Sequence, residues 1–157
     1  MAAHLRVAPD PEADLPASGT AERPIRVVLA DDHVLMRKTL RLLLDGEEDV
    51  EVVAEAADHP TAVRHVNGHE PDVLVLDLRM PDGFSAERIE RLGAASPGTK
   101  IVVTTLHVNE AFATEALGAG AIGFVLADSA DRELVEAVRC AVRGLPYTSP
   151  KIRRAVA

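Results

Sequence analysis

Several residue types are scarce in this chain of 157 residues, and each shortage excludes a class of protein. The only cysteine is Cys140, which excludes an internal disulfide and a thiolate metal cluster. Aromatic residues make up 3% of the chain, so we expect an aliphatic core. No apolar run approaches the length that crosses a membrane, and residues 1–8 are too short and too polar for a secretory signal. We therefore expect a cytoplasmic protein that does not enter a membrane.

Positive charge is also in short supply. The chain has 17 Lys and Arg residues against 25 Asp and Glu residues, which gives a formal net charge of −8. A surface with this balance repels nucleic acids and anionic membranes, so we expect this chain to bind neither directly. The apolar content of 47% is sufficient for one domain with a real core.

The two end segments differ in composition from the rest of the chain. Residues 1–24 are rich in Ala, Pro, Asp and Glu and show no apolar period, so we expect a disordered extension. Residues 146–157 contain several basic residues and are expected to be the stub of a linker, with no output domain present. The folded domain is expected to span residues 25–145.

Five short β-favouring runs alternate with five segments of helical periodicity in this domain. The central run consists of four apolar residues followed by Asp77, as expected for a strand buried on both faces of a sheet. Regular alternation of strands and helices predicts an α/β fold, with a parallel sheet, helices on both faces and right-handed crossovers. The expected strands are 25–30, 50–55, 73–77, 101–105 and 121–126.

Polar residues stand at the ends of three of these strands. Asp31 and Asp32 follow the first strand, Asp77 ends the third and Thr105 ends the fourth. The carboxyl ends of parallel strands meet at one edge of a sheet, so these side chains should converge there. Three clustered carboxylates repel one another unless a hard cation lies among them, and all-oxygen ligation favours Mg²⁺. A carboxylate beside Mg²⁺ can attack phosphorus and become an acyl phosphate.

At these residues the sequence resembles the receiver domains of two-component response regulators. The resemblance covers residues 25–145, and within this family the sequence is most similar to the NarL/FixJ branch. It rests on the segments Asp-Asp-His-Val-Leu-Met-Arg, Leu-Asp-Leu-Arg-Met-Pro and Ala-Ile-Gly-Phe-Val-Leu. It implies a flavodoxin-like, doubly wound sheet of five parallel strands. It also implies a signalling module rather than an enzyme, with at most self-catalysed phosphotransfer and dephosphorylation.

The resemblance assigns the acidic residues their roles by position. Asp77 is the expected phosphoryl acceptor, and it also belongs to the expected Mg²⁺ site. Asp32 is the expected direct ligand of the metal, and Asp31 the expected ligand through a water molecule. The backbone carbonyl of Arg79 completes the protein's share of the metal shell.

The same resemblance assigns switch residues and partners. Thr105 and Phe124 are expected to repack when the phosphoryl group arrives. The expected phosphodonor is a sensor histidine kinase, and the expected response is a change in a protein-interaction or homodimer surface. Transcription would then be controlled through a DNA-binding domain that lies outside this chain.

One position departs from the family pattern. Receivers carry a lysine three residues after the aromatic switch residue, and here that residue is Ala127. Losing the charge-assisted hydrogen bond of this lysine to the phosphoryl oxygens costs roughly 1.5–3 kcal/mol. Arg79 could supply a substitute cation. The alternative is a degenerate receiver that serves as a phosphorylation-independent protein-binding scaffold, which Ala127 favours and the three acids argue against.

Other interpretations of these residues stay open from the sequence alone. Asp32 could cap the following helix, and Phe124 could be an ordinary core aromatic. His33 and His107 are expected to be solvated loop residues rather than ligands. A hydrolase with an aspartate nucleophile is disfavoured, because such phosphatases carry a second acid two residues after the nucleophile, where this chain has Arg79.

Overall fold

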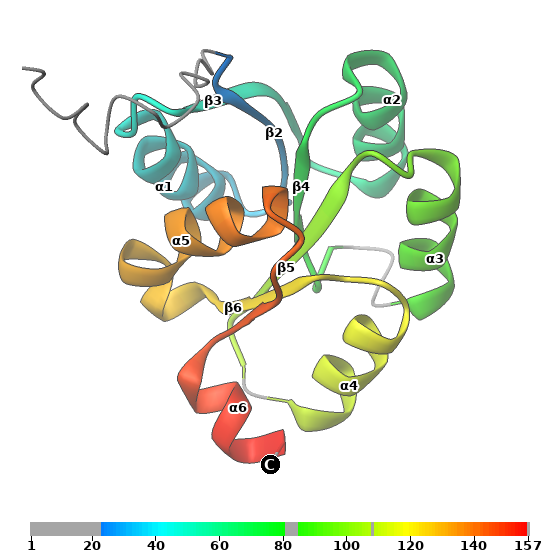
Figure 1. Ribbon diagram of the computed structural model, residues 1–157, viewed down its shortest axis with the longest axis vertical. Coiled ribbons are helices and arrows are strands. Elements are labelled where there is room, and N and C mark those ends of the chain that lie inside the picture. Colours follow the sequence, from blue (N-terminus) through cyan, green and yellow to red (C-terminus); the bar gives the residue numbers. More distant parts are fainter. Residues whose placement is uncertain (1–22, 81–84, 108, 157) are drawn as a thin grey trace, which may run out of the picture.

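The computed structural model describes residues 23–80, 85–107 and 109–156, which form a parallel sheet between two layers of helices (Figure 1). The strand order is β3-β2-β4-β5-β6-β7, and every neighbouring pair is parallel. The sheet consists of β2 (Ile25–Ala30), β3 (Val50–Ala56), β4 (Val73–Asp77), β5 (Lys100–Thr105), β6 (Gly123–Leu126) and β7 (Tyr147–Thr148). The α/β architecture predicted from the alternation of strands and helices is confirmed.

Two groups of helices cover the two faces of the sheet. One face is covered by α1 and α5, and the other by α2, α3, α4 and α6 (Figure 1). The helices are α1 (Val34–Asp45), α2 (His59–His69), α3 (Ala86–Ala95), α4 (Glu110–Gly118), α5 (Ala130–Val142) and α6 (Pro150–Val156), with a 3-10 turn, η1 (Ala127–Ser129), before α5.

Alternation of side chains along the strands creates a separate core on each face. In β2, Val27 and Leu29 pack with α1 and α5, whereas Val28 and Ala30 pack on the opposite side. All four are buried, as are the four apolar residues of β4. The central strand is therefore enclosed on both faces, as its unbroken apolar run predicts.

The fifth predicted strand begins two residues later than expected. Ala121 donates its N–H to the carbonyl of Ala116 at 3.0 Å, which ties it to the end of α4. Gly120 has a φ of 114°, a conformation that few other residues adopt without strain. The strand therefore starts at Gly123, after the chain has turned out of the helix.

The expectation that residues 146–157 form a linker stub of a five-stranded domain is wrong. Within this segment, β7 pairs with β6, and α6 brings the fully buried Ile152 into the core that contains Phe124. The physical reason is that β6 would otherwise leave a row of backbone donors and acceptors unpaired at the edge of the sheet. The flavodoxin-like sheet consequently has six strands.

Most of the amino-terminal extension predicted for residues 1–24 lies outside the described residues. Its described end is attached to the domain, because the guanidinium of Arg23 donates to the carboxylate of Asp72 at 2.8 Å. Across the described ranges, none of the helices combines the length and the apolar character needed to span a bilayer.

Candidate functional site

The strand register brings the predicted polar residues to one edge of the sheet. Ala30 of β2 pairs with Leu76 of β4, and the next residue in each segment is an aspartate, Asp31 or Asp77. Thr105 is the last residue of β5, which is the other neighbour of β4. The prediction that these strand ends converge is confirmed by the register.

The acidic side chains form a cluster that also includes a histidine. Ligand atoms of Asp31, Asp32, His33 and Asp77 all lie within 4.8 Å of one another. Nδ1 of His33 lies 3.1 Å from Oδ1 of Asp32 and 3.9 Å from Oδ2 of Asp77. His33 was expected to be a solvated loop residue, and its side chain is indeed 57% exposed, but its ring lies against the acids. The sequence signal for this position was its place directly after two aspartates at a strand end.

Asp31 is buried and Asp77 is half-buried, and this burial raises the pKa values of both carboxyl groups. Oδ1 of Asp31 accepts a hydrogen bond of 2.8 Å from the backbone N–H of His33. Burial raises the pKa of Asp31 despite this hydrogen bond. Burial is also the main reason that the pKa of Asp77 is raised to about 7, with the charges of Asp31 and Asp32 as further causes. The N–H of Arg79 opposes this shift by donating to Oδ1 of Asp77 at 3.1 Å.

The third carboxylate carries an unsatisfied oxygen. Oδ1 of Asp32 is buried and accepts no well-aligned hydrogen bond among the described residues, although Nδ1 of His33 lies 3.1 Å away. A buried carboxylate oxygen without a well-aligned donor costs free energy that a cation at this position would offset. Asp32 does not cap α1 either, because the N-cap residue is His33 and it makes no side-chain capping bond. The helix-cap alternative for Asp32 is therefore wrong.

The donor set fits a hard divalent cation. Asp31, Asp32 and Asp77 offer carboxylate oxygens only, which is the ligand chemistry that Mg²⁺ prefers. These three residues could hold the ion. The carbonyl of Arg79 stays a predicted further ligand.

Thr105 and Phe124 point away from solvent. Oγ1 of Thr105 lies 3.3 Å from both the backbone N and the carbonyl O of His107. Phe124 is fully buried in the core beside α4 and α6. The structure thus shows Phe124 as a core aromatic. The switch roles of both residues stay predictions.

The position expected to hold a lysine lies at the same edge of the sheet. Leu126 pairs with Thr105, and Ala127 follows directly, half-buried, as the first residue of η1. Its methyl group offers no charge or hydrogen bond to this edge. The side chain of Arg79, the suggested substitute cation, is exposed.

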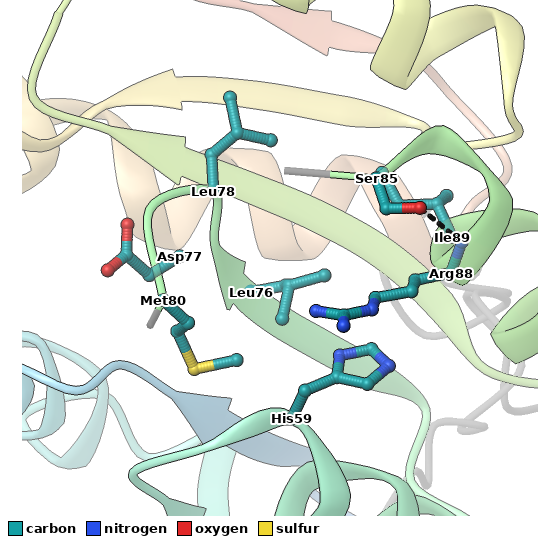
Figure 2. Close-up of a pocket in the computed structure, with 8 residues that line it drawn as sticks. All are labelled: His59, Leu76, Asp77, Leu78, Met80, Ser85, Arg88 and Ile89. Atoms are coloured by element: carbon teal, nitrogen blue, oxygen red, sulfur yellow. Dashed lines mark hydrogen bonds between the residues drawn. The ribbon is translucent and has the colours of Figure 1, made fainter. Parts of the chain in front are cut away.

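Two other basic side chains, those of Arg88 and His59, line a small cavity at the end of β4, on the side away from the carboxylate of Asp77. Figure 2 shows the guanidinium of Arg88 beside the imidazole of His59, while the carboxylate of Asp77 points away from both. Leu76 lies between these groups in the same view. The cavity is lined by His59, Leu76, Asp77, Leu78, Met80, Ser85, Arg88 and Ile89. Arg88 and His59 therefore do not take the place of the lysine beside the carboxylate.

Comparison with known proteins identifies the family. Residues 27–139 match the family model described as the response regulator receiver domain. The chain belongs to this family. The oxygen regulatory protein NreC of Staphylococcus epidermidis is 39% identical over 129 residues, which cover 82% of this chain and 59% of NreC. The transcriptional regulatory protein DegU of Brevibacillus brevis is 34% identical over 131 residues, which cover 83% of this chain and 56% of DegU.

Solved structures place the receiver in the NarL/LuxR group. A LuxR-family two-component response regulator from Aurantimonas sp. has a TM-score of 0.80 and 34% identity, covering 85% of this chain and 95% of that one. The receiver domain of the putative response regulator NarL from Mycobacterium tuberculosis has a TM-score of 0.73 and 35% identity, covering 78% and 98%. The chain is a NarL-like receiver that spans less than three fifths of the length of the curated relatives NreC and DegU.

Proposed function

We propose that this receiver accepts a phosphoryl group on Asp77 from a sensor histidine kinase in the cytoplasm, or from a small phosphodonor. The observation that carries the proposal is the cluster of three carboxylates at neighbouring strand ends, in which Oδ1 of Asp32 is buried without a well-aligned hydrogen bond. Such a cluster is poorly stable by itself, and it suits a cation beside a nucleophilic oxygen.

The two oxygens of Asp77 have different surroundings, which supports one of them as the nucleophile. Oδ1 accepts the N–H of Arg79, so Oδ2 is the oxygen left to attack phosphorus. As the new P–O bond forms, the P–N bond of a phosphohistidine breaks, and its electron pair stays on the histidine nitrogen. Mg²⁺ held by Asp31, Asp32 and Asp77 would offset the negative charge of the carboxylates and of the incoming oxygens.

Thr105 is suited to respond to the new group. Its hydroxyl contacts the backbone of His107 at a long 3.3 Å, so little is lost when it turns toward a phosphoryl oxygen. Phe124 lies on the next strand and would repack in the space that Thr105 vacates. Together they would alter the surface formed by α4, β6 and α5, against which β7 and α6 lie.

The output belongs to the proposal as well. NreC and DegU carry the names of regulatory proteins and are much longer than the matched region. We therefore propose that the altered surface changes homodimer formation and controls transcription through a DNA-binding domain outside this chain. The acidic balance of this chain supports a division in which the receiver itself does not bind DNA.

The test is incubation of the purified chain with Mg²⁺ and acetyl phosphate, followed by intact-protein mass spectrometry. We expect the mass of one phosphoryl group to be added to the wild type and to Asp45→Asn, a matched change at the exposed end of α1. Asp77→Asn should gain nothing. No adduct in the wild type, together with no Mg²⁺ binding, would contradict the proposal and favour the scaffold alternative that Ala127 suggests.

A further inference from the structure

Three polar groups of Asp31 are held by separate parts of the chain. Its backbone N–H donates to the carbonyl of Ala56 at the end of β3, at 2.9 Å. Its Oδ1 accepts from the N–H of His33 at 2.8 Å. Its backbone carbonyl accepts from Nη1 of Arg37 at 2.6 Å. In the first two contacts the partner of Asp31 is a backbone group, of Ala56 or of His33. In the third contact the partner is a side chain, that of Arg37.

The guanidinium of Arg37 is itself fixed. Arg37 is the fourth residue of α1, and its side chain is only 17% exposed. Its Nε donates to Oε1 of Glu55 in β3 at 3.1 Å. The other carboxylate oxygen of Glu55 accepts from Nη1 of Arg41, one turn further along α1. Arg37 therefore joins α1, β3 and the residue that follows β2 in one hydrogen-bonded arrangement.

The contact with Asp31 acts on the direction of the chain. The carbonyl that Arg37 binds belongs to the peptide group that joins Asp31 to Asp32. Because a peptide group is planar, holding its oxygen constrains the direction in which the chain continues to Asp32. The positive charge of Arg37 is offset by Glu55, with which it pairs directly. Its influence on the acidic cluster is therefore geometric.

We propose that Arg37 is a positioning residue of the metal site, which orients the peptide between Asp31 and Asp32 so that both carboxylates face Asp77. This inference rests on the proposed function, because it presumes that the three acids bind Mg²⁺. Arg37 acts through the backbone of Asp31 and not as a ligand. Residues that orient metal ligands in this way typically change metal affinity by roughly 10–100-fold when they are replaced.

Mg²⁺ titrations of the wild type, Arg37→Gln and Arg37→Lys test the proposal, with calorimetry as the readout. Lysine keeps the charge but has no planar fork to bind the Asp31 carbonyl and Glu55 together. We expect both variants to bind Mg²⁺ roughly tenfold more weakly or worse. Arg139→Gln is the matched control, because it removes a guanidinium that pairs with Asp49, on the loop before β3. This control should bind Mg²⁺ like the wild type.

Amide hydrogen exchange in the metal-free proteins gives a second readout. The N–H of His33, which donates to Asp31, should exchange faster in both Arg37 variants and at the wild-type rate in Arg139→Gln. Wild-type affinity and exchange in Arg37→Gln would overturn the inference and leave the proposed function intact. Weaker Mg²⁺ binding by Arg37→Gln together with wild-type Mg²⁺ affinity in Arg37→Lys would also overturn the inference, since a positive charge alone would then suffice. A wild type that binds no Mg²⁺ contradicts the proposed function and with it a role of Arg37 in a metal site, and the exchange rates then report only whether Arg37 orients the peptide between Asp31 and Asp32.

Discussion

Oγ of Ser149 donates a hydrogen bond of 2.6 Å to Oε1 of Glu133 and accepts one of 2.9 Å from the backbone N–H of Leu126. The hydroxyl of Tyr147 donates to the same oxygen of Glu133 at 3.1 Å. Burial, together with the charge of Glu133, raises the pKa of Tyr147 to about 12, so the hydroxyl stays protonated at neutral pH. These bonds fasten β7 and the start of α6 to α5 and to the end of β6.

Ser149→Ala is expected to lower the free energy of unfolding by about 1–3 kcal/mol, because the buried N–H of Leu126 loses its acceptor and Glu133 loses a donor. Urea unfolding followed by circular dichroism measures the change. Thr39→Ala is the control, since that hydroxyl lies on the exposed side of α1 and donates only to the carbonyl of Leu35. It should shift stability by less than about 0.5 kcal/mol. Equal effects of the two changes would contradict the prediction.

Two glycine substitutions should change stability in opposite directions. A Cβ at Gly123 would lie 3.1 Å and 3.2 Å from the two methyl groups of Val102 on the neighbouring strand. Gly123→Ala is therefore expected to destabilise the protein by about 1–3 kcal/mol through overpacking. A Cβ at Gly93 in α3 would meet nothing within 4 Å, so Gly93→Ala should stabilise it by about 0.5–1 kcal/mol. Thermal unfolding midpoints that move in the same direction would count against this account of the packing.

The stability of the metal-free protein should fall as the pH rises through 7. Asp77 has a pKa of about 7 in the folded protein against 3.8 for an ordinary aspartate, so the folded state holds its proton more tightly than the unfolded state. The resulting stabilisation is complete below the unfolded pKa and is lost as the pH passes the folded pKa.

Urea unfolding in the presence of a chelator, from about pH 5 to pH 8, measures this decline. Asp77→Asn should remove the part of the decline that belongs to Asp77, and Mg²⁺ should restore stability above pH 7 in the wild type only. An identical pH dependence in Asp77→Asn would show that other groups cause the decline.

Ala127→Lys should increase phosphorylation of Asp77. Ala127 follows the residue that pairs with Thr105, so a lysine there would begin at the same edge of the sheet as the acceptor. A charge-assisted hydrogen bond of about 1.5–3 kcal/mol corresponds to a roughly ten- to hundredfold gain in the phosphorylated-to-free ratio.

The ratio is measured by intact mass at a fixed concentration of acetyl phosphate and Mg²⁺. Ala127→Met adds a chain of similar length without charge and serves as the control, which should behave like the wild type. A gain shared by both variants would point to packing, and no gain in either would mean that the ammonium does not reach the phosphoryl group.

The acidic edge of the sheet was predictable because it depends on the order of residues along strands. The apolar runs that lead into Asp31, Asp77 and Thr105 are long enough to identify as strands, and parallel pairing then brings their ends together. The contacts of Arg37 were not predictable in this way. They depend on how α1 lies against β3, which the order of residues along the chain does not reveal.

The carboxy-terminal strand could not be predicted from its own residues. Tyr147 and Thr148 are too short a run to show an alternating pattern, and their pairing depends on the free edge that β6 offers. The basic residues that follow indicated a solvated linker. They did not reveal that Ile152, a single apolar residue among them, is fully buried.

The shortness of β7 has a consequence for how copies of this receiver could associate. A long outer strand would invite another molecule to extend the sheet, whereas Tyr147 and Thr148 present too few main-chain groups to support such an extension. At the other end of the sheet, β3 carries a register shift in its pairing with β2, and irregular pairing of this kind also discourages continuation across molecules. The dimer formation proposed above would therefore use helix surfaces and side chains, which a signalling event can remodel, in preference to intermolecular β-sheets, which it could not readily undo.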